Sequence, residues 1–93
     1  MRFVWDIRKA ETNLRKHGVS FDEAATVFDD IDALCLYDPD HSQDEDRFIL
    51  LGLSASTRIL VVCHCYREEE EVVRIISARK ATDKERSEYI RRK

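Results

Sequence analysis

Three apolar segments in the second half of the chain follow one another with very short connections between them. They read RFILLGLS (47–54), ILVVCHCYR (59–67) and VVRIISAR (72–79), and four residues separate each from the next. Short runs rich in Val, Ile, Leu and Phe are typical of β-strands. Such connections join antiparallel neighbours, because a parallel crossover needs a dozen or more residues. The middle segment is apolar on both faces, so we expect it at the centre of a sheet.

The N-terminal third predicts two helices. Asp6 is suited to be the N-cap of a helix that continues to about His17, and Gly18 is suited to end it with a positive φ. Ser20 and Glu23 form an S-x-x-E capping box for a second helix. That second helix is acidic, which argues against a DNA-reading helix–turn–helix.

The remaining elements complete a single domain over residues 1–93. Short strands are expected at 2–6 and 33–38. Thr82 and Glu85 make a second capping box, which opens a polar C-terminal helix. The predicted order is β-α-α-β-β-β-β-α. It describes an α+β fold in which two N-terminal helices and one C-terminal helix pack on an antiparallel sheet.

The composition is that of a compact protein with a strongly ionic surface. Apolar residues make up 43% of the chain and charged residues 38%. No apolar run approaches the roughly 20 residues needed to cross a bilayer, and the first residues, MRFVWDIRK, lack the pattern of a signal peptide. Three cysteines cannot all pair within the chain, so we expect reduced thiols. These features favour the cytoplasm, without membrane contact.

Charge is strongly segregated along the chain. The net charge is only −3, but residues 20–46 hold ten acidic residues and no Lys or Arg. Basic residues gather at the two ends of the chain and at single strand positions. General affinity for nucleic acid is therefore not expected, although a basic surface can still form where these positions meet in the fold.

The sequence CHC at 63–65 is the most conspicuous candidate for a metal site. Strand alternation sends Cys63 and Cys65 to one face and His64 to the other, and no second Cys or His pair completes a tetrahedral set. A structural role in the core is the favoured interpretation. The chain also lacks the glycine-rich nucleotide-binding motifs and the serine elbow. We expect no metal and no cofactor.

Arginines on the predicted strands are the remaining candidates for chemistry. Arg47 opens one strand, Arg67 closes the next, and Arg74 and Arg79 lie in the middle and at the end of the last. Alternation would place Arg79 on the same face as Val73. The residues alone favour salt bridges to the many carboxylates. The alternative is a phosphate clamp, since guanidinium groups bind phosphate with two hydrogen bonds.

Several motifs together resemble the BrnT family of bacterial toxins. They are RKAETNLRKHGVSFDEAATVF, DEDRFILLGLS, ILVVCHCY and VVRIISARKATDKERSEY, and with Trp5–Asp6 they extend over about residues 3–89. The pairing of N-x-x-K-H-G-V-S-F with R-I-I-S-A-R-K-A is the most specific part.

This resemblance implies a fold similar to the RelE toxins and a ribonuclease activity that arrests growth without a metal. It also implies a partner, a BrnA-like antitoxin with a ribbon–helix–helix segment, in a complex expected to be a heterotetramer. That complex would repress its own operon, so the toxin would reach operator DNA only through the antitoxin. The acidic segment 20–46 offers a surface for a basic part of the antitoxin.

Metal-free RNA cleavage needs a proton acceptor, a proton donor and cations around the reacting phosphate. With the resemblance, Arg79 becomes the first candidate for the phosphate clamp, supported by Arg67. Lys9 and His17 are candidates for RNA contact or proton transfer, and His17 is equally suited to end its helix. Glu45 is a candidate base, or the partner of an ion pair.

Further residues are candidates for RNA binding. Arg47 can act as a second clamp or pair with a carboxylate. Lys16 lies in the matching N-terminal motif, Trp5 can stack on a base or pack in the core, and Lys80 adjoins Arg79 but can equally face solvent. A non-catalytic alternative stays open. In it, the chain is an interaction module that acts as co-repressor with a ribbon–helix–helix partner.

Overall fold

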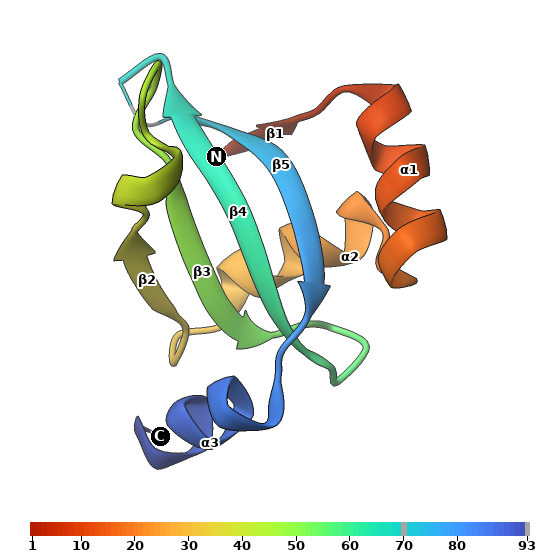
Figure 1. Cartoon of the computed structure of the whole chain (residues 1–93), viewed down its shortest axis with the longest axis vertical. Helices are drawn as coiled ribbons and strands as arrows, with labels where there is room; N and C mark the ends of the chain where they lie inside the picture. The colour runs from red at the N-terminus through yellow and green to blue at the C-terminus, as the bar shows by residue number, and fades with distance from the viewer. Residues whose placement is uncertain (70, 93) are drawn as a thin grey trace.

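The computed structural model describes residues 1–69 and 71–92 as a five-stranded sheet with helices on both sides (Figure 1). Helices α1 and α2 pack against β5, and α3 packs against β3 at one end of the opposite face. This mixed architecture confirms the predicted α+β class. The elements are β1 (Arg2–Val4), α1 (Ile7–His17), α2 (Phe21–Thr26), η1 (Val27–Asp29), β2 (Leu34–Tyr37), η2 (Pro39–His41), β3 (Phe48–Leu53), β4 (Ile59–Arg67), β5 (Val72–Lys80) and α3 (Asp83–Arg92).

The strand order across the sheet is β1-β5-β4-β3-β2. The strands β2 to β5 pair antiparallel with their neighbours, as the short connections predicted. The first strand is different, because β1 lies parallel to β5. The predicted antiparallel sheet is therefore wrong at this edge. The rule on short connections did not apply to β1, which is joined by helices to the strand that follows it in the sequence.

An irregularity in β5 changes which residues share a face. Cys63 pairs with Ser77, but the next residue, His64, pairs with Ile75, so Ile76 has no partner in β4. This extra residue is a β-bulge, and it inverts the alternation that follows it. Arg79 consequently pairs with Val61 and lies on the face opposite the α1–α2 layer. The expectation that Arg79 shares a face with Val73 was wrong for this reason.

Two apolar clusters hold the layers together. The larger one lies between the sheet and the N-terminal helices, and includes Phe21, Val27 and Leu60. The smaller one lies under α3 and centres on Tyr89 and Leu51. Each sheet face is therefore covered in part, and the uncovered part of the second face carries the polar groups described below. Among the described residues, no helix has the length and apolar character needed to span a membrane.

The helix ends match the sequence signals with one exception. Asp6 accepts hydrogen bonds from the first amides of α1, and Gly18 ends that helix with φ 67°. Ser20 accepts from the amide of Glu23, but the Glu23 carboxylate binds Arg58 and Ser54, so the return half of this capping box is replaced by tertiary contacts. At α3 the box has both halves.

The side chain of Asn13 closes the edge of β5 beyond the short strand β1. Its Nδ2 donates to the carbonyls of Ala78 and Val19 at 2.8 and 2.9 Å, and its Oδ1 accepts from the Ala78 amide at 3.1 Å. The carboxamide thus takes the place of a neighbouring strand. It also holds the last turns of α1 at a fixed distance from β5.

Candidate active site

Two clefts meet at the bulge of β5, and both are lined by Ile76 and Ser77. The first lies between α1 and β5, and the second lies on the open face of the sheet. The bulge therefore contributes the same two residues to a helix-side cleft and to a sheet-side cleft. The first cleft is further lined by Arg8, Lys9, Thr12, Asn13, Lys16 and His17, and the second by Asp38, His41, Arg47, Ile49, Val61, Cys63 and Arg79.

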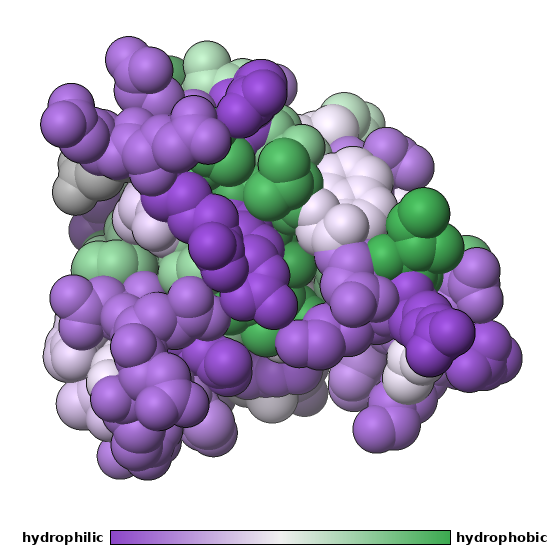
Figure 2. Space-filling model, turned by 90° about the horizontal axis from the view of Figure 1, so that it is seen from above, coloured by the Kyte–Doolittle hydropathy of each residue, from purple (hydrophilic) through white to green (hydrophobic). Residues whose placement is uncertain are grey.

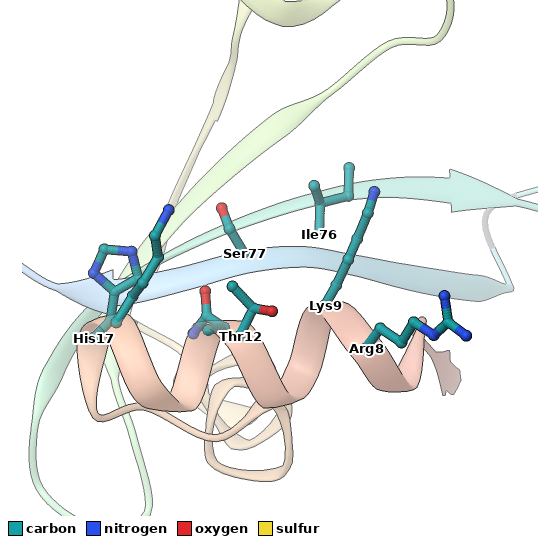
Figure 3. A pocket seen from close by; sticks show the side chains of 8 residues that line it. Arg8, Lys9, Thr12, His17, Ile76 and Ser77 are labelled. Atoms are coloured by element: carbon teal, nitrogen blue, oxygen red, sulfur yellow. The ribbon is translucent and has the colours of Figure 1, made fainter.

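The first cleft is basic. Lys9 and His17 extend from α1 on the side of β5 that carries Ile76 and Ser77, whereas Arg8 points away from them (Figure 3). These groups are solvent-exposed, and the helical spacing of α1 brings successive turns to the same cleft. Since Asn13 anchors this helix to β5, the cations stand at a defined position beside the bulge. Lys9, Lys16 and His17, three of the predicted residues, are brought together here.

Arg47 is the most informative side chain of the second cleft. Among the described residues, its Nε is a buried side-chain nitrogen without a hydrogen-bond partner. A buried guanidinium nitrogen left unpaired is unfavourable. Arg47 as a whole is half-buried and lines the cleft, so its positive charge is available there to an anion. The other arginines of this sheet face are already paired. The ion pair that was one alternative for Glu45 and Arg47 is not made between these two residues, because Glu45 pairs with Arg74 and Arg67 instead.

Arg79 lines the same cleft, and a carboxylate of α3 holds its guanidinium. Its guanidinium donates to both carboxylate oxygens of Glu85, at 2.8 and 3.0 Å. Glu85 in turn accepts from the Thr82 amide at 2.8 Å, and the Thr82 hydroxyl accepts from the Glu85 amide. The Arg79 hydrogen bond is the main cause that lowers the pKa of Glu85 to about 2. These hydrogen bonds connect the end of β5 to the start of α3, and a phosphate bound at Arg79 would share its guanidinium with Glu85.

A histidine–carboxylate pair completes the second cleft. His41 Nδ1 lies 2.9 Å from Asp38 Oδ2, and the Asp38 side chain is 11% exposed whereas that of His41 is 67% exposed. The Ser42 hydroxyl donates to the Asp38 carbonyl and accepts from the Arg47 amide, which folds this loop over the end of β3. A buried carboxylate that orients an accessible imidazole is an arrangement suited to proton transfer.

Glu45 and Arg67 lie further along the same face, in a separate ionic group. Glu45 is 3.1 Å from Arg74 and 3.7 Å from Arg67. Its single carboxylate is therefore shared by two cations, one on β4 and one on β5. Glu45 and Arg67 are thus brought together, but neither lines the two clefts at the bulge.

Trp5 and Lys80 also lie outside both clefts. The ring of Trp5 meets Phe21 edge-on, with 5.9 Å between centroids, and packs against the larger core. Lys80 is exposed at the end of β5. Trp5 is thus a packing residue in this structure, and Lys80 faces solvent.

The CHC segment is divided between the two faces of the sheet. Cys63 lines the second cleft, whereas the His64 ring is fully buried among Phe28, Phe48 and Tyr66 on the other face. Burial raises the pKa of the Cys63 thiol and lowers the pKa of the His64 imidazole. The described residues contain no group of three or more His, Cys, Asp or Glu side chains placed to hold a metal ion.

Sequence reasoning did not single out Asp38, His41, Ser77 and Asn13, which line the two clefts. His41 and Asp38 were within the acidic loop, where their spacing of three residues was the available signal. Ser77 depends on the bulge, for which the sequence carries no glycine.

The comparisons with known proteins identify the family. The model for the ribonuclease toxin BrnT of type II toxin–antitoxin systems matches residues 5–85. The chain belongs to the BrnT family. A similar solved structure, the Brucella abortus ribonuclease toxin BrnT, is 26% identical, with a TM-score of 0.66, over 89% of this chain and 99% of that one. Among curated proteins, none matches.

Membership of the BrnT family confirms the resemblance seen in the sequence motifs. The matched region contains every residue of the two clefts and also Glu85, the partner of Arg79. The family description supports a ribonuclease toxin with an antitoxin as its partner.

Proposed function

We propose that this BrnT-family toxin is a metal-independent endoribonuclease that cleaves RNA at the two clefts beside the β5 bulge. The positive charge of Arg47, which pairs with no carboxylate of the described residues and lines a cleft with Arg79, is the observation that carries this proposal. Two guanidinium groups can bind one phosphate and stabilise the charge that develops during cleavage. An RNA strand across Ile76 and Ser77 would also contact Lys9 and Lys16 through its neighbouring phosphates.

The reaction uses the ribose as its own nucleophile. The 2′-oxygen attacks the adjacent phosphorus while a base takes the 2′-hydroxyl proton, the bond from phosphorus to the 5′-oxygen breaks, and an acid protonates that oxygen. The products are a 2′,3′-cyclic phosphate and a 5′-hydroxyl. We assign one proton transfer to His41, oriented by Asp38, and the other to His17 from the opposite cleft.

The remaining predicted residues receive supporting roles. Glu45 and Arg67 form the ionic group at the far end of the open face, and we assign Arg67 to phosphates further along the RNA rather than to the reaction. Arg79 is a clamp whose strength is limited by Glu85. We retain the likeness to RelE toxins, the ribbon–helix–helix antitoxin, the heterotetramer and operon repression as parts of the proposal.

A cleavage assay on naked RNA in EDTA tests this function. The purified chain is incubated with a labelled oligonucleotide, and the new ends are analysed for a cyclic phosphate. Arg47→Ala is expected to lower the rate at least about 100-fold, which is typical for loss of one group that stabilises the transition state. Arg91→Ala, an exposed arginine in α3 outside both clefts, is the matched control and should keep full activity. Cleavage that needs added metal ions, or that survives Arg47→Ala, would refute the proposal.

A second candidate, a non-catalytic co-repressor, is favoured by one observation. Three arginines of the open face already have carboxylate partners, since Arg79 pairs with Glu85 and Glu45 pairs with Arg74 and Arg67. In this case the chain would bind its antitoxin tightly and leave RNA intact at micromolar concentration. The same assay separates the two functions.

A further inference from the structure

The two edges of the sheet differ in whether their outward backbone groups have partners. Beyond β1, the exposed edge of β5 is closed by the Asn13 carboxamide. At the other edge lies β2, and no strand of the described residues lies beside it (Figure 1). An open edge presents unpaired backbone groups, and proteins usually protect such edges with Lys, Pro or a covering element.

The register shows which backbone groups of β2 are free. The Asp38 amide donates to the Arg47 carbonyl at 2.9 Å, so these two residues form a hydrogen-bonded pair. In an antiparallel ladder every second pair is hydrogen-bonded, so Leu36 and Leu34 also form their hydrogen bonds with β3. The amides and carbonyls of Cys35 and Tyr37 therefore point away from β3. Within the described residues, β2 pairs only with β3, and no backbone hydrogen bond of the turns and loops reaches these four groups.

Apolar side chains accompany this edge. Leu36 and Tyr37 are each 51% exposed, and Ile31, just before the strand, is 96% exposed. None of the protective residues is present within β2, whose sequence is Leu-Cys-Leu-Tyr. An exposed apolar edge with free backbone groups is the pattern recognised when an extended segment adds a strand to a sheet.

Acidic residues surround the same strand. Asp32 precedes it, Asp40 follows it, and Asp46 accepts a hydrogen bond from the Tyr37 hydroxyl at 3.2 Å. No Lys or Arg occurs between residues 20 and 46. A second copy of the chain would bring like charges together at this edge, whereas a basic segment would be attracted to it.

We propose that the outer edge of β2 is the docking site for an extended, basic segment of the antitoxin, which adds a strand to the sheet. Backbone groups of Cys35 and Tyr37 would supply the hydrogen bonds. Leu36 and Ile31 would make the apolar contacts. The flanking aspartates would favour a segment that contains Lys and Arg. The proposal rests on membership of a toxin–antitoxin family, not on ribonuclease activity, and it places the antitoxin away from the two clefts.

Replacement of Cys35 tests the backbone contact. Cys35→Pro removes the outward amide without touching the bonds to β3, and Cys35→Ala is the control that keeps the amide. Affinity is measured by calorimetry with the purified full-length antitoxin encoded beside this chain's gene. We expect the proline variant to bind at least about tenfold more weakly than the alanine variant, as the loss of one well-formed hydrogen bond implies. Equal affinities would overturn the proposal.

Hydrogen exchange tests the same contact without any substitution, in case the proline variant does not fold. The amides of Cys35 and Tyr37 should exchange rapidly in the free toxin and become protected in the complex. Exchange at these two amides that stays fast in a saturated complex would overturn the proposal.

Two leucines of equal exposure provide a matched test of the side chains. Leu36 is 51% exposed on β2 and Leu14 is 52% exposed on α1. Leu36→Lys should weaken antitoxin binding at least about tenfold, because it adds a charge that repels a basic partner, and Leu14→Lys should not. The reverse result would place the antitoxin on α1 and overturn the proposal. Each of these experiments measures the complex with the antitoxin, so a chain that cleaves no RNA can still confirm the docking site.

Discussion

The Asn13 carboxamide and the backbone of Ala78 are joined by two hydrogen bonds, one in each direction, 65 positions apart in the sequence. Both groups are buried. This contact fixes α1 against β5 one turn from Lys9 and His17, and next to the bulge at which the two clefts meet. It therefore links the stability of the fold to the geometry of the candidate site.

Replacement of Asn13 should be strongly destabilising. Asn13→Ala leaves the amide and carbonyl of Ala78 without their partner, and we expect a loss of about 3 kcal/mol in the free energy of unfolding. Asn13→Asp is nearly isosteric but turns a donor into an acceptor that faces two carbonyls, so it should destabilise at least as much. Urea denaturation measures both. A loss below about 1 kcal/mol would show that water replaces the carboxamide.

Glu85 should contribute stability that depends on pH. Its pKa in the folded protein is about 2, below the ordinary value of 4.5, chiefly because of the hydrogen bond from Arg79. The contribution is therefore complete above about pH 4.5 and is lost as the pH falls towards 2. Because Arg79 is 42% exposed, solvent screening limits it to about 1 kcal/mol. The difference in unfolding free energy between the wild type and Glu85→Gln should shrink below pH 4. A difference that stays constant down to pH 2 would contradict this assignment.

In the proposed function, Glu85 competes with RNA for Arg79. If Arg79 clamps a phosphate, Glu85→Gln should bind RNA more tightly, by roughly the factor of 3 to 10 expected when a charged competitor becomes neutral. Arg79→Ala should weaken RNA binding and relieve growth arrest while the protein stays folded. Filter binding at fixed salt measures the first, and plate assays measure the second. Weaker binding by Glu85→Gln would mean that the ion pair serves only to position α3.

The sequence signals for individual elements were strong because they are local. Caps at Asp6 and Thr82, the left-handed Gly18 and the short connections between strands each depend on neighbouring residues, and the structure shows all of them. The signal of Glu23 was ambiguous, because a capping carboxylate within reach of Arg58 makes the stronger, charge-assisted contact instead.

The candidate site was less predictable because it depends on pairing across the sheet. The extra residue Ile76 moves Arg79 to the open face, and no residue type in the strand indicates that a bulge is present. The partners of Arg79 and Glu45 were likewise undetermined, since several carboxylates were available to each arginine. The motif that contains Asn13 was found only through family resemblance, as an asparagine in a helix does not by itself indicate an edge contact.

The two glycines should respond to substitution for different reasons. A Cβ at Gly52 would lie 2.8 Å from Val27 Cγ1 and 2.9 Å from Ala33 Cβ, so Gly52→Ala should destabilise by about 1–3 kcal/mol through overpacking. Gly18 has open space but φ +67°, so Gly18→Ala should lose about 1 kcal/mol through backbone strain. Substitution by asparagine distinguishes the two positions, because asparagine tolerates a positive φ but has a larger side chain than alanine. Gly18→Asn should be milder than Gly18→Ala, and Gly52→Asn worse than Gly52→Ala, in thermal unfolding.

Proton transfer by the pair of His41 and Asp38 makes the sharpest prediction for catalysis. His41→Asn removes the imidazole from the second cleft and should lower kcat about 100-fold with little change in KM, as is typical for loss of a general acid or base. Asp38→Asn keeps the imidazole but removes the carboxylate 2.9 Å from Nδ1, so its effect should be smaller and should shift the pH dependence of kcat. His17→Asn reports on the first cleft, and since acid and base act in the same displacement, the double variant should lose no more than the sum of the two single losses. Exogenous imidazole should restore activity to His41→Ala but not to Arg47→Ala, which a purely structural role for His41 would not produce.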